Sequence, residues 1–396
     1  MARINSFVNM NKPLVIGASS IVVAGGFKRW DNESRLSSLL IAFQKQLECL
    51  QPEVVMCETT QMIEETHPSG DSGNEELTRS SLNHLPELIR PLFSLLCWSV
   101  ILSIWVAAGF GPIYLIFTLV NQAWSSALTF FCVWLLGGFL TFPEFPWLAH
   151  QIANGLEYWF PFFAIKYEGQ KFRTGSDANA VQRTMYCYHP HGLFSIGAAL
   201  LAADLIRRGE KVAFVTSSHM RWFNPLAKIM MDLAGIEIVG ATATEVQAAM
   251  RKGERSLILV PGGYEEAVFT QKGFERLFLK TRLGFVKYAM RYGYTLTPVY
   301  AYGENDLYAC ISIASRLRDW FAAYKIPLMV FYGHSAMPLM PNRTPLKIIV
   351  GEPVVVRRIQ EPSSPQLHDA HTKYVETLSD LYYRYNEYPD RPLEIT

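Results

Sequence analysis

The pattern of apolar and polar positions divides the chain into three stretches. Residues 1–89 join short apolar segments to a long polar one, and residues 90–147 are almost entirely apolar. From residue 148 to the end, short apolar runs alternate with amphipathic ones. These changes predict an amino-terminal extension, a hydrophobic hairpin and a folded α/β domain, in that order.

The amino-terminal extension contains three segments of different character. Residues 14–27 form a short apolar patch with no cleavage site after it, so we interpret it as an interfacial or loosely packed segment, with a targeting peptide as the alternative. Leucines at helical spacing over residues 36–50 predict an amphipathic helix that docks on the main domain or lies on a membrane. Residues 51–83 are acidic and lack aromatic side chains, which predicts a disordered linker.

The second stretch has the length and composition of a membrane hairpin. No Asp, Glu, Lys or Arg occurs between Arg90 and Glu144, where apolar runs cover residues 92–120 and 127–142. A helix needs roughly 20 apolar residues to cross a bilayer, so the first run is long enough and the second slightly short. We expect both ends on the same side, and a kinked or re-entrant first helix at Gly111-Pro112. A buried helical pair in a soluble core is the alternative, which the absence of charge disfavours.

The third stretch predicts a mixed or largely parallel sheet flanked by helices. An aromatic patch at residues 158–163 precedes it, and we expect this patch at the lipid–water interface rather than in the core. Expected strands cover residues 185–189, 211–216, 236–239, 256–260, 295–300, 328–331 and 347–350. Expected helices cover residues 193–208, 225–234, 244–252, 284–292, 306–324 and 365–385.

Charge and cysteine content exclude several classes of protein. The formal net charge is +1, which gives no reason to expect nucleic acid as a partner. The six cysteines show no CxxC pairing, which argues against a zinc site and against a secreted disulfide framework. Reduced thiols in a cytosol-facing protein fit better.

The pentapeptide Tyr188-His189-Pro190-His191-Gly192 is the strongest candidate for chemistry. It closes an expected strand and precedes an expected helix, an arrangement that presents side chains beside a helix amino terminus. Histidine titrates near neutral pH, so two imidazoles in this turn suggest proton transfer. A turn whose histidines only cap local backbone groups is the alternative.

Three further clusters lie at or beyond the ends of expected strands, where open α/β sheets commonly place their sites. The first, from Pro261 to Glu266, pairs Gly262 and Gly263 with two carboxylates, although an ordinary turn also explains it. The second is basic, with a solvated face as its simplest explanation, and consists of Lys272, Arg276, Lys280, Arg282 and Lys287. The third is Gly303-Glu304-Asn305-Asp306, for which a helix cap is the simplest explanation.

Several kinds of site are absent from the sequence. There is no GxSxG elbow, no GxGxxG and no P-loop, which leaves serine hydrolases and nucleotide cradles unsupported. His189 and His191 could chelate a metal with His219 or a glutamate, but no third ligand stands at a recognisable spacing, so we expect none. The acyltransferase pattern of a histidine with an aspartate five positions later also fails, because Phe194 and Ile196 occupy those positions.

Acyl transfer to a lipid alcohol accounts for the remaining features together. A histidine can remove a proton from an alcohol that attacks a thioester, and the helix amino terminus behind Gly192 could stabilise the oxyanion. Basic side chains could hold the phosphates of a soluble acyl carrier such as coenzyme A. The hairpin would keep the site near lipid.

The sequence from about Tyr158 to Tyr385 resembles the type-2 diacylglycerol acyltransferase family, which includes monoacylglycerol and wax-alcohol acyltransferases. His189-Pro190-His191-Gly192 stands as the family's HPHG block, and Glu266 takes the place of the glutamate in its glycine–glutamate block. The other matching blocks, in the same order, are Trp159-Phe160-Pro161, Gly284 to Lys287, Thr297 to Asp306, Gly351-Glu352-Pro353 and His371 to Tyr374. The chain departs from the family at Lys228 and at Arg282, where the family carries an Arg-Glu pair and a basic pair.

The resemblance implies a membrane-anchored acyltransferase domain that moves an acyl chain from acyl-CoA to diacylglycerol, with no metal or bound cofactor. For this reaction we expect His191, which adjoins the turn glycine and the helix start, as general base, with His189 orienting or polarising and Glu266 holding an imidazole in the useful tautomer. Which of the two histidines is the base stays open. The substrate-binding residues that the resemblance implies are Gly192, Gly262, Gly263, Arg282, Lys287, Glu304 and Asn305. The resemblance further implies the endoplasmic reticulum membrane or lipid droplets as location, a cytosolic catalytic domain, and contact with membrane lipid. A homo-oligomer, another acceptor (monoacylglycerol or a long-chain alcohol) and a non-catalytic lipid-droplet or reticulum protein stay open.

Overall fold

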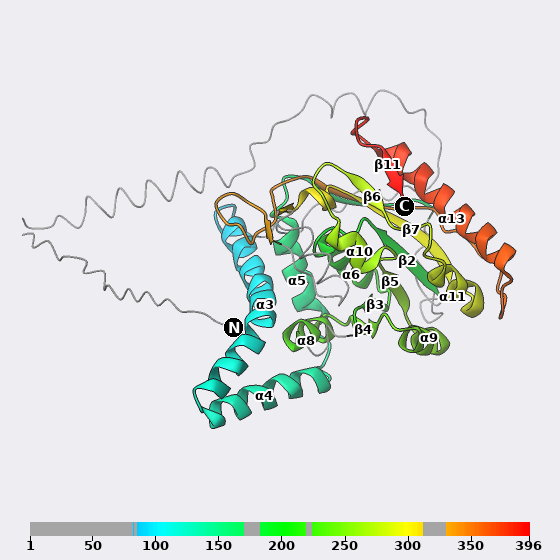
Figure 1. The fold of residues 1–396 in the computed structure, drawn as a ribbon. Helices are drawn as coiled ribbons and strands as arrows, with labels where there is room; N and C mark the ends of the chain where they lie inside the picture. The colour runs from blue at the N-terminus through cyan, green and yellow to red at the C-terminus, as the bar shows by residue number, and fades with distance from the viewer. Residues whose placement is uncertain (1–81, 83–84, 170–182, 219–223, 312–329) are drawn as a thin grey trace, which may run out of the picture. The chain divides into compact units, whose positions relative to one another are not determined.

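The computed structural model describes residues 82, 85–169, 183–218, 224–311 and 330–396 (Figure 1). All of them belong to one unit of the chain, Met56–Thr396. The expected apolar patch at 14–27 and the amphipathic helix at 36–50 lie outside the described residues. So does the acidic stretch 51–83, apart from Leu82. These three expectations stay predictions.

A mixed, mostly parallel sheet forms the centre of the described domain. Within the described residues its seven strands lie in the order β1 (Phe163–Tyr167), β10 (Leu346–Val350), β7 (Thr295–Tyr302), β2 (Thr184–His189), β5 (Ser256–Leu259), β3 (Val212–Thr216) and β4 (Glu237–Gly240). Every neighbouring pair is parallel except β10 and β7. The predicted α/β architecture is therefore confirmed.

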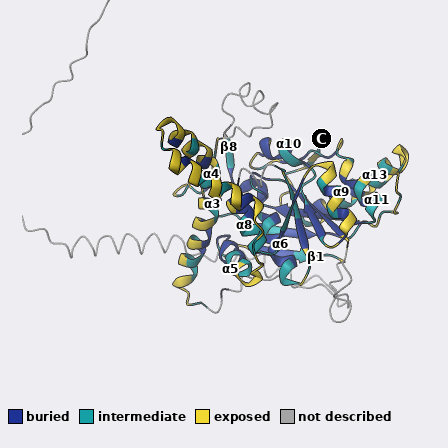
Figure 2. Cartoon of the chain, turned by 90° about the horizontal axis from the view of Figure 1, so that it is seen from below, coloured by how far each residue is buried: buried dark blue, intermediate teal, exposed yellow. Residues whose placement is uncertain are grey.

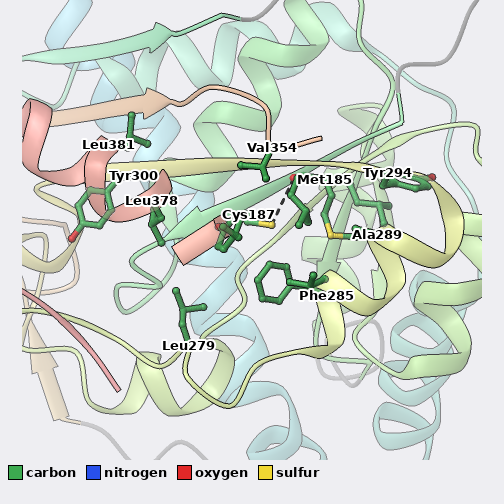
Figure 3. Close-up of a cluster of buried hydrophobic side chains, with 14 of the residues drawn as sticks. Met185, Cys187, Leu279, Phe285, Ala289, Tyr294, Tyr300, Val354, Leu378 and Leu381 are labelled. Carbon is green, nitrogen blue, oxygen red and sulfur yellow. Dashed lines mark hydrogen bonds between the residues drawn. The ribbon is translucent and has the colours of Figure 1, made fainter. Parts of the chain in front are cut away.

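Alternation along β2 sends its side chains to two faces of the sheet. Met185 and Cys187 join a buried cluster with residues of α11 (Gly284–Tyr292) and α13 (Ser364–Tyr385), part of which Figure 3 shows. On the other face, the Tyr188 hydroxyl lies where a Cβ on Gly197 of α6 (Ile196–Arg207) would have to stand. Because both faces are covered, β2 is an apolar run buried along its whole length.

The remaining helices follow the predicted alternation closely. The described residues form α8 (Pro225–Leu233) and α9 (Ala243–Lys252) near their expected positions, and also α5 (Pro146–Glu157) and the short α10 (Gly263–Val268), which the sequence pattern did not predict. Asn224 caps α8 and Thr242 caps α9, each through a side-chain oxygen that accepts from a backbone N–H of the first turn. Helix α5 packs against both α3 (Ile89–Val120) and α6.

Two small sheets of three-residue strands were predicted only in part: residues 330–331 of the strand expected over 328–331 belong to one of them, and the other strands were missed. Strand β6 (Glu275–Leu277) pairs in parallel with β11 (Leu393–Ile395), and β8 (Ala309–Ile311) pairs antiparallel with β9 (Val330–Tyr332). The helix expected over 306–324 is therefore wrong at its start, where a 3-10 turn and β8 stand. Residues 312–329 lie outside the described part of the chain.

The aromatic patch at 158–163 packs mainly inside the protein, so its expected place at the lipid–water interface is wrong. Trp159, Phe160 and Phe163 are buried, and only Phe162 among the rings of 159–163 is exposed, at 46%. The Trp159 Nε1–H donates to the Pro341 carbonyl at 2.9 Å, which satisfies the one polar atom of the indole. Phe163 begins β1, an edge strand that the sequence pattern did not predict.

The charge-free stretch forms two apolar helices, α3 and α4 (Trp124–Phe139), which contact each other. Of the described helices, α3 alone is long and apolar enough to cross a membrane, and only 6% of its most apolar window is buried in the chain. Much of the surface of both helices is exposed (Figure 2). Because a soluble protein rarely exposes so much contiguous apolar surface, this arrangement indicates that the protein associates with a membrane.

Helix α3 runs through Gly111-Pro112 without interruption, and the kink expected there stays a prediction. Pro112 lies inside the helix. Gly111 allows close contact with α4, because a Cβ there would stand 2.8 Å from Trp134 Cη2.

Candidate active site

Three turns meet at one edge of the sheet. Strands β2, β5 and β7 are parallel neighbours, so the segments that follow them emerge side by side. These segments carry His191, Glu266 and Glu304, each from a different one of the predicted clusters. Hydrogen bonds join the first turn to each of the other two.

In the imidazole of His191, one ring nitrogen is hydrogen-bonded and the other has no hydrogen-bond partner among the described residues. Its Nδ1 lies 3.0 Å from the Gly192 carbonyl oxygen and 3.2 Å from the Ser195 hydroxyl oxygen. A carbonyl can only accept, so Nδ1 carries the hydrogen and Nε2 keeps its lone pair. Burial lowers the pKa of His191 below its ordinary value. The ring is therefore a neutral base whose Nε2 has no protein partner among the described residues.

Ser195 is a contributor that the sequence pattern did not identify. It has a positive φ of 51°, a conformation rare for residues with a side chain, and it is the N-cap residue of α6. Its hydroxyl donates to the His191 carbonyl at 2.9 Å, which turns an oxygen lone pair toward Nδ1–H of the same residue. The only sequence signal was a serine four positions after a histidine in a turn.

Glu266 binds the backbone of the histidine turn rather than an imidazole. Its Oε1 accepts from the His191 backbone N–H at 2.6 Å, and its Oε2 accepts from the Phe278 N–H at 3.1 Å. Burial raises the pKa of this carboxyl to about 7. The expected tautomer-setting contact is thus replaced by one that fixes where the turn stands.

Glu304 occupies the amino terminus of α6. Its Oε1 accepts from the Ile196 N–H and its Oε2 from the Gly197 N–H, both at 2.9 Å, and the Tyr188 hydroxyl adds a bond of 2.7 Å. Burial raises the pKa of Glu304 to about 7. The expectation that this helix terminus stabilises an oxyanion is therefore wrong for these two N–H groups, because a carboxylate already takes both.

Gly192 and the glycines after β5 are placed by backbone geometry. Gly192 has a φ of 57°, and a Cβ there would stand 2.6 Å from Glu304 Cγ. Gly262 packs against the Glu266 carboxylate, whereas Gly263, with a φ of 64°, faces open space. Of the three, Gly263 leaves the most room for a ligand.

His189 lies on the opposite face of β2 from Tyr188, completely buried. Its Nε2 lies 2.9 Å from the Tyr374 hydroxyl of α13, while its Nδ1 has no hydrogen-bond partner in the described part of the chain. Burial lowers the pKa of His189 to about 3, so the ring is neutral. The His189 side chain cannot reach a substrate unless α13, which covers it through Tyr374, moves away.

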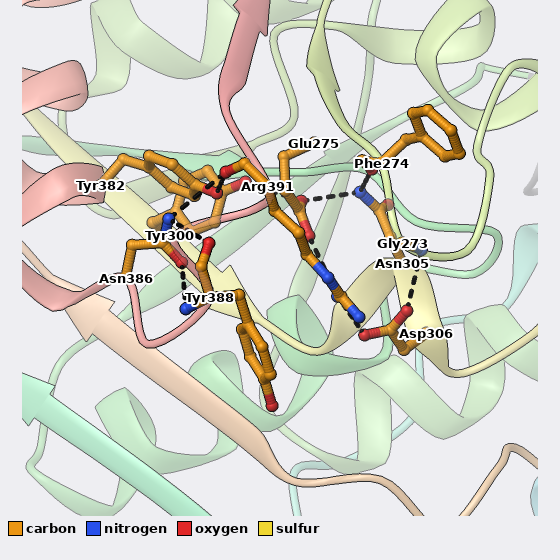
Figure 4. A network of polar contacts seen from close by, with 10 residues as sticks. All are labelled: Gly273, Phe274, Glu275, Tyr300, Asn305, Asp306, Tyr382, Asn386, Tyr388 and Arg391. Atoms are coloured by element: carbon orange, nitrogen blue, oxygen red, sulfur yellow. Dashed lines mark hydrogen bonds and ion pairs between the residues drawn. The ribbon is translucent and has the colours of Figure 1, made fainter.

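Asn305 is one of a group of polar residues that joins the carboxyl-terminal segment to the sheet (Figure 4). Its amide donates to the Phe274 carbonyl and to Glu275 Oε2, both at 2.9 Å. The neighbouring Asp306 pairs with Arg391 at 2.6 Å. Asn305 and Glu304 are both buried and engaged, which places them in the framework rather than at the expected substrate surface.

The basic cluster is divided between paired arginines and exposed lysines. Arg282 pairs with Glu265 at 2.6 Å, beside the Glu266 turn, and Arg276 pairs with Glu394 at 2.8 Å. Lys287 lies exposed on α11, as do Lys272 and Lys280 in their loops. Arg282 is therefore the basic residue of this set most directly linked to the histidine turn.

Aromatic side chains connect the apolar helix α3 to the histidine turn. Phe194, three residues after His191, has its ring centroid 5.5 Å from that of Trp105 on α3. It also contacts Tyr308 and Phe331, each at 5.2 Å. The catalytic candidate thus lies beside aromatic side chains that connect it to the apolar helix α3.

The described residues offer no cluster of three or more His, Cys, Asp or Glu side chains able to hold a metal ion. His219, the third ligand considered from sequence, lies outside the described residues.

Comparison with known proteins identifies relatives with a stated activity. The chain is 29% identical over 230 residues to diacylglycerol O-acyltransferase 1 of Schizosaccharomyces pombe, which covers 54% of this chain and 66% of that protein. It is 31% identical over 220 residues to diacylglycerol O-acyltransferase 2B of Umbelopsis ramanniana, covering 50% and 62%. It is 30% identical over 210 residues to human acyl-CoA wax alcohol acyltransferase 2, covering 49% and 63%. The matched region thus spans just under two thirds of each relative's length.

Among solved structures, the 1-acyl-sn-glycerophosphate acyltransferase PlsC from Thermotoga maritima aligns with a TM-score of 0.37 at 12% identity, covering 77% of this chain and 100% of that one. This similarity is too low to bear on fold or chemistry. The family described as diacylglycerol acyltransferase, in contrast, matches residues 147–394, which contain the whole sheet and all three turns of the site. The resemblance seen in the sequence is confirmed, and the chain belongs to the diacylglycerol acyltransferase family.

Proposed function

We propose that the protein transfers a fatty acyl chain from acyl-CoA to the free hydroxyl of diacylglycerol, giving triacylglycerol and free coenzyme A. Family membership and the names of the relatives support this reaction. The observation that carries it is the His191 imidazole, with Nδ1–H bonded to the Gly192 carbonyl and Nε2 free. That arrangement is what a general base for an alcohol requires.

The reaction follows from this tautomer. Nε2 of His191 removes the hydroxyl proton of the acceptor while the hydroxyl oxygen attacks the thioester carbonyl carbon. A carbon–oxygen bond forms, the carbon–sulfur bond breaks, and the imidazolium returns its proton to the departing thiolate. Because burial lowers the pKa of His191, the ring is neutral and ready to accept a proton at neutral pH.

The surrounding residues position this base. Glu266 fixes the His191 backbone, and Ser195 together with the Gly192 carbonyl fixes the ring. His189 would orient the turn through its hydrogen bond to the Tyr374 hydroxyl of α13. Acyl-CoA is a co-substrate in this proposal, and no metal or bound cofactor takes part.

The contact between Trp105 and Phe194 supports a lipid acceptor. It joins the histidine turn to the exposed apolar helix α3, through which we propose that the protein contacts lipid, so a glycerolipid could reach His191 without leaving the bilayer surface. We assign the protein to the endoplasmic reticulum membrane, with lipid droplets as a second location and the catalytic domain facing the cytosol.

The same chemistry on a long-chain alcohol or a monoacylglycerol is the second candidate. The similarity to human acyl-CoA wax alcohol acyltransferase 2 supports a long-chain alcohol as an acceptor to be tested. A panel of diacylglycerol, monoacylglycerol and long-chain alcohol, tested with one labelled acyl-CoA, distinguishes these acceptors.

His191→Ala tests the proposed base. We expect the variant to lose acyl transfer to every acceptor while it still sediments with membranes. His368→Ala is the matched control, because His368 is exposed on α13, and it should keep wild-type activity. Substantial activity in His191→Ala would remove the assignment, and a wild-type protein inert with all acceptors would revive a non-catalytic role.

A further inference from the structure

A basic cavity lies at the end of β2 opposite the histidine turn. It has a volume of about 300 Å³, and Arg183, Arg251, Arg291 and Arg358 contribute to its wall together with Tyr292 and Gln360. Arg183 directly precedes β2, whereas His189 ends it, so the six-residue strand separates the two places by roughly 20 Å. The cavity is therefore not part of the candidate active site.

Two helix ends shape the cavity. Arg251 and Arg291 lie in the last turns of α9 and α11, and each helix ends in a glycine with positive φ. Arg183 packs against the first of these, Gly253, where a Cβ would stand 2.9 Å from its Nε. Arg358 packs against the second in the same way, with its Cδ 3.2 Å from the position of a Cβ on Gly293. The absence of side chains at both helix ends thus lets two more arginines approach.

Favourable contact with helix carboxyl termini explains one arginine per helix but not this set of four. The described lining includes no carboxylate, and none of the four arginines forms an ion pair with a described residue. Nearby Arg255, by contrast, pairs with both Glu237 and Glu144. The Arg291 Nε–H donates to the Gln360 carbonyl at 2.8 Å, which fixes the direction of that guanidinium. Arg183, Arg251 and Arg358 are exposed and Arg291 is half-buried, so water weakens the repulsion among the four like charges, and an anion between them would offset the remainder.

We propose that this cavity is a second binding site, for a phosphate-bearing anion. Guanidinium groups match the geometry of phosphate oxygens and bind them in pairs, which makes arginine the preferred residue for phosphate recognition. The volume lies at the lower end of the range for small-molecule sites. The phosphate is that of a small soluble compound or of a phospholipid headgroup, and the two sources share the chemistry argued here. The site is independent of the proposed acyl transfer.

The test compares two double variants that remove the same charge. Arg251→Gln with Arg358→Gln removes two arginines of the wall, whereas Lys252→Gln with Arg357→Gln removes their exposed sequence neighbours. Purified full-length protein is titrated with inorganic phosphate at constant ionic strength, with melting temperature as readout. It is also floated with phosphatidylcholine vesicles, with and without phosphatidylglycerol. Melting curves without phosphate check folding, and Arg358→Gln alone is measured in case the double variant misfolds.

We expect the wall variant to bind phosphate about tenfold more weakly than wild type, while the neighbour variant stays close to wild type. A loss confined to the phosphate titration assigns a soluble compound, and a loss confined to phosphatidylglycerol vesicles assigns a headgroup. Equal behaviour of the two double variants in both assays, or no binding by wild type in either, overturns the proposal.

Discussion

The backbone N–H of His191 and the Oε1 of Glu266 are 2.6 Å apart, and this bond joins the turn after β2 to the turn after β5. Glu266→Ala leaves two backbone N–H groups without their acceptor, those of His191 and Phe278. We expect a loss of about 1–3 kcal/mol in unfolding free energy for each uncompensated buried group, and up to about 100-fold in kcat through misplacement of the base. Denaturant melts and initial rates measure the two effects.

Glu265→Gln is the matched control for this prediction. Glu265 is the adjacent residue, exposed and paired with Arg282 rather than with the histidine turn. It should leave kcat within about twofold of wild type, since exposed ion pairs contribute little. A similar loss in both variants would show that the helix as a whole, and not the bond to His191, supports activity.

The acidic limb of the pH–rate profile should lie below pH 6.5. The base acts only when neutral, and because burial lowers its pKa from the ordinary 6.5, it stays neutral to a lower pH and loses activity as pH falls through the lowered value. The profile of kcat/KM against pH measures this limb. Burial raises the pKa of Glu266 to about 7, so this carboxyl could also produce an acidic limb. If the limb persists in Glu266→Gln, it belongs to His191. A limb at or above pH 6.5 in that variant contradicts the assignment.

Gly192→Ala should be more destabilising than Gly263→Ala, although both residues have positive φ. An added Cβ at Gly192 would meet Glu304 Cγ at 2.6 Å, whereas Gly263 has nothing within 4 Å of that position. Strain alone costs about 1–2 kcal/mol, and the overlap at Gly192 adds about 1–3 kcal/mol. Thermal melts of the two variants give the comparison, and equal losses would mean that the contact with Glu304 relaxes freely.

Ser195 offers a paired test of backbone strain and ring positioning. Ser195→Gly removes the hydroxyl and also the strain of a residue with a side chain at positive φ. Ser195→Ala removes the hydroxyl and keeps that strain. We expect both to lower kcat by a similar few-fold factor, because the Gly192 carbonyl still holds Nδ1–H, and Gly to be more stable than Ala by about 1 kcal/mol. Unchanged kcat in both would show that the hydroxyl plays no part in placing the ring.

Trp105→Ala should reduce activity without releasing the protein from membranes. It removes a ring contact with Phe194, and such pairs contribute about 0.5–1.5 kcal/mol beyond burial. Trp124→Ala is the control, since Trp124 is 65% exposed at the start of α4. Acyl transfer and membrane sedimentation are compared in the same extracts. Equal activity of the two variants would mean that the contact between α3 and the histidine turn is dispensable.

The sequence pattern predicted every strand of the main sheet except β1, because burial on both faces of a sheet selects short apolar runs. Strand β2 is such a case, with every residue buried. Strands β6 and β11 could not be found in this way, because three residues show no periodicity and the pairing of Glu275 with Leu393 joins distant parts of the chain. The edge strand β1 was hidden by its aromatic neighbours, which resembled an interfacial belt.

The clusters of the candidate site were predicted, but the roles of several residues within them were not. The order of parallel strands brings His191, Glu266 and Glu304 together, as open sheets generally do at their carboxyl edge. Which atom of a neighbour each carboxylate would bind depends on angstrom-scale placement between residues 75 and 108 positions apart. Local pattern carries no such information, so the backbone contact of Glu266 and the capping of α6 by Glu304 emerged only in three dimensions.

The pairing of β11 with β6 has a practical consequence for any expression vector. Thr396 bonds through its backbone to Leu277, Leu279 and Lys280, on either side of the Phe278 N–H that binds Glu266. A deletion of the last six residues would also remove Arg391 from its pair with Asp306. Because these contacts hold the segment that carries the Phe278 N–H, a purification handle is better attached away from residues 391–396.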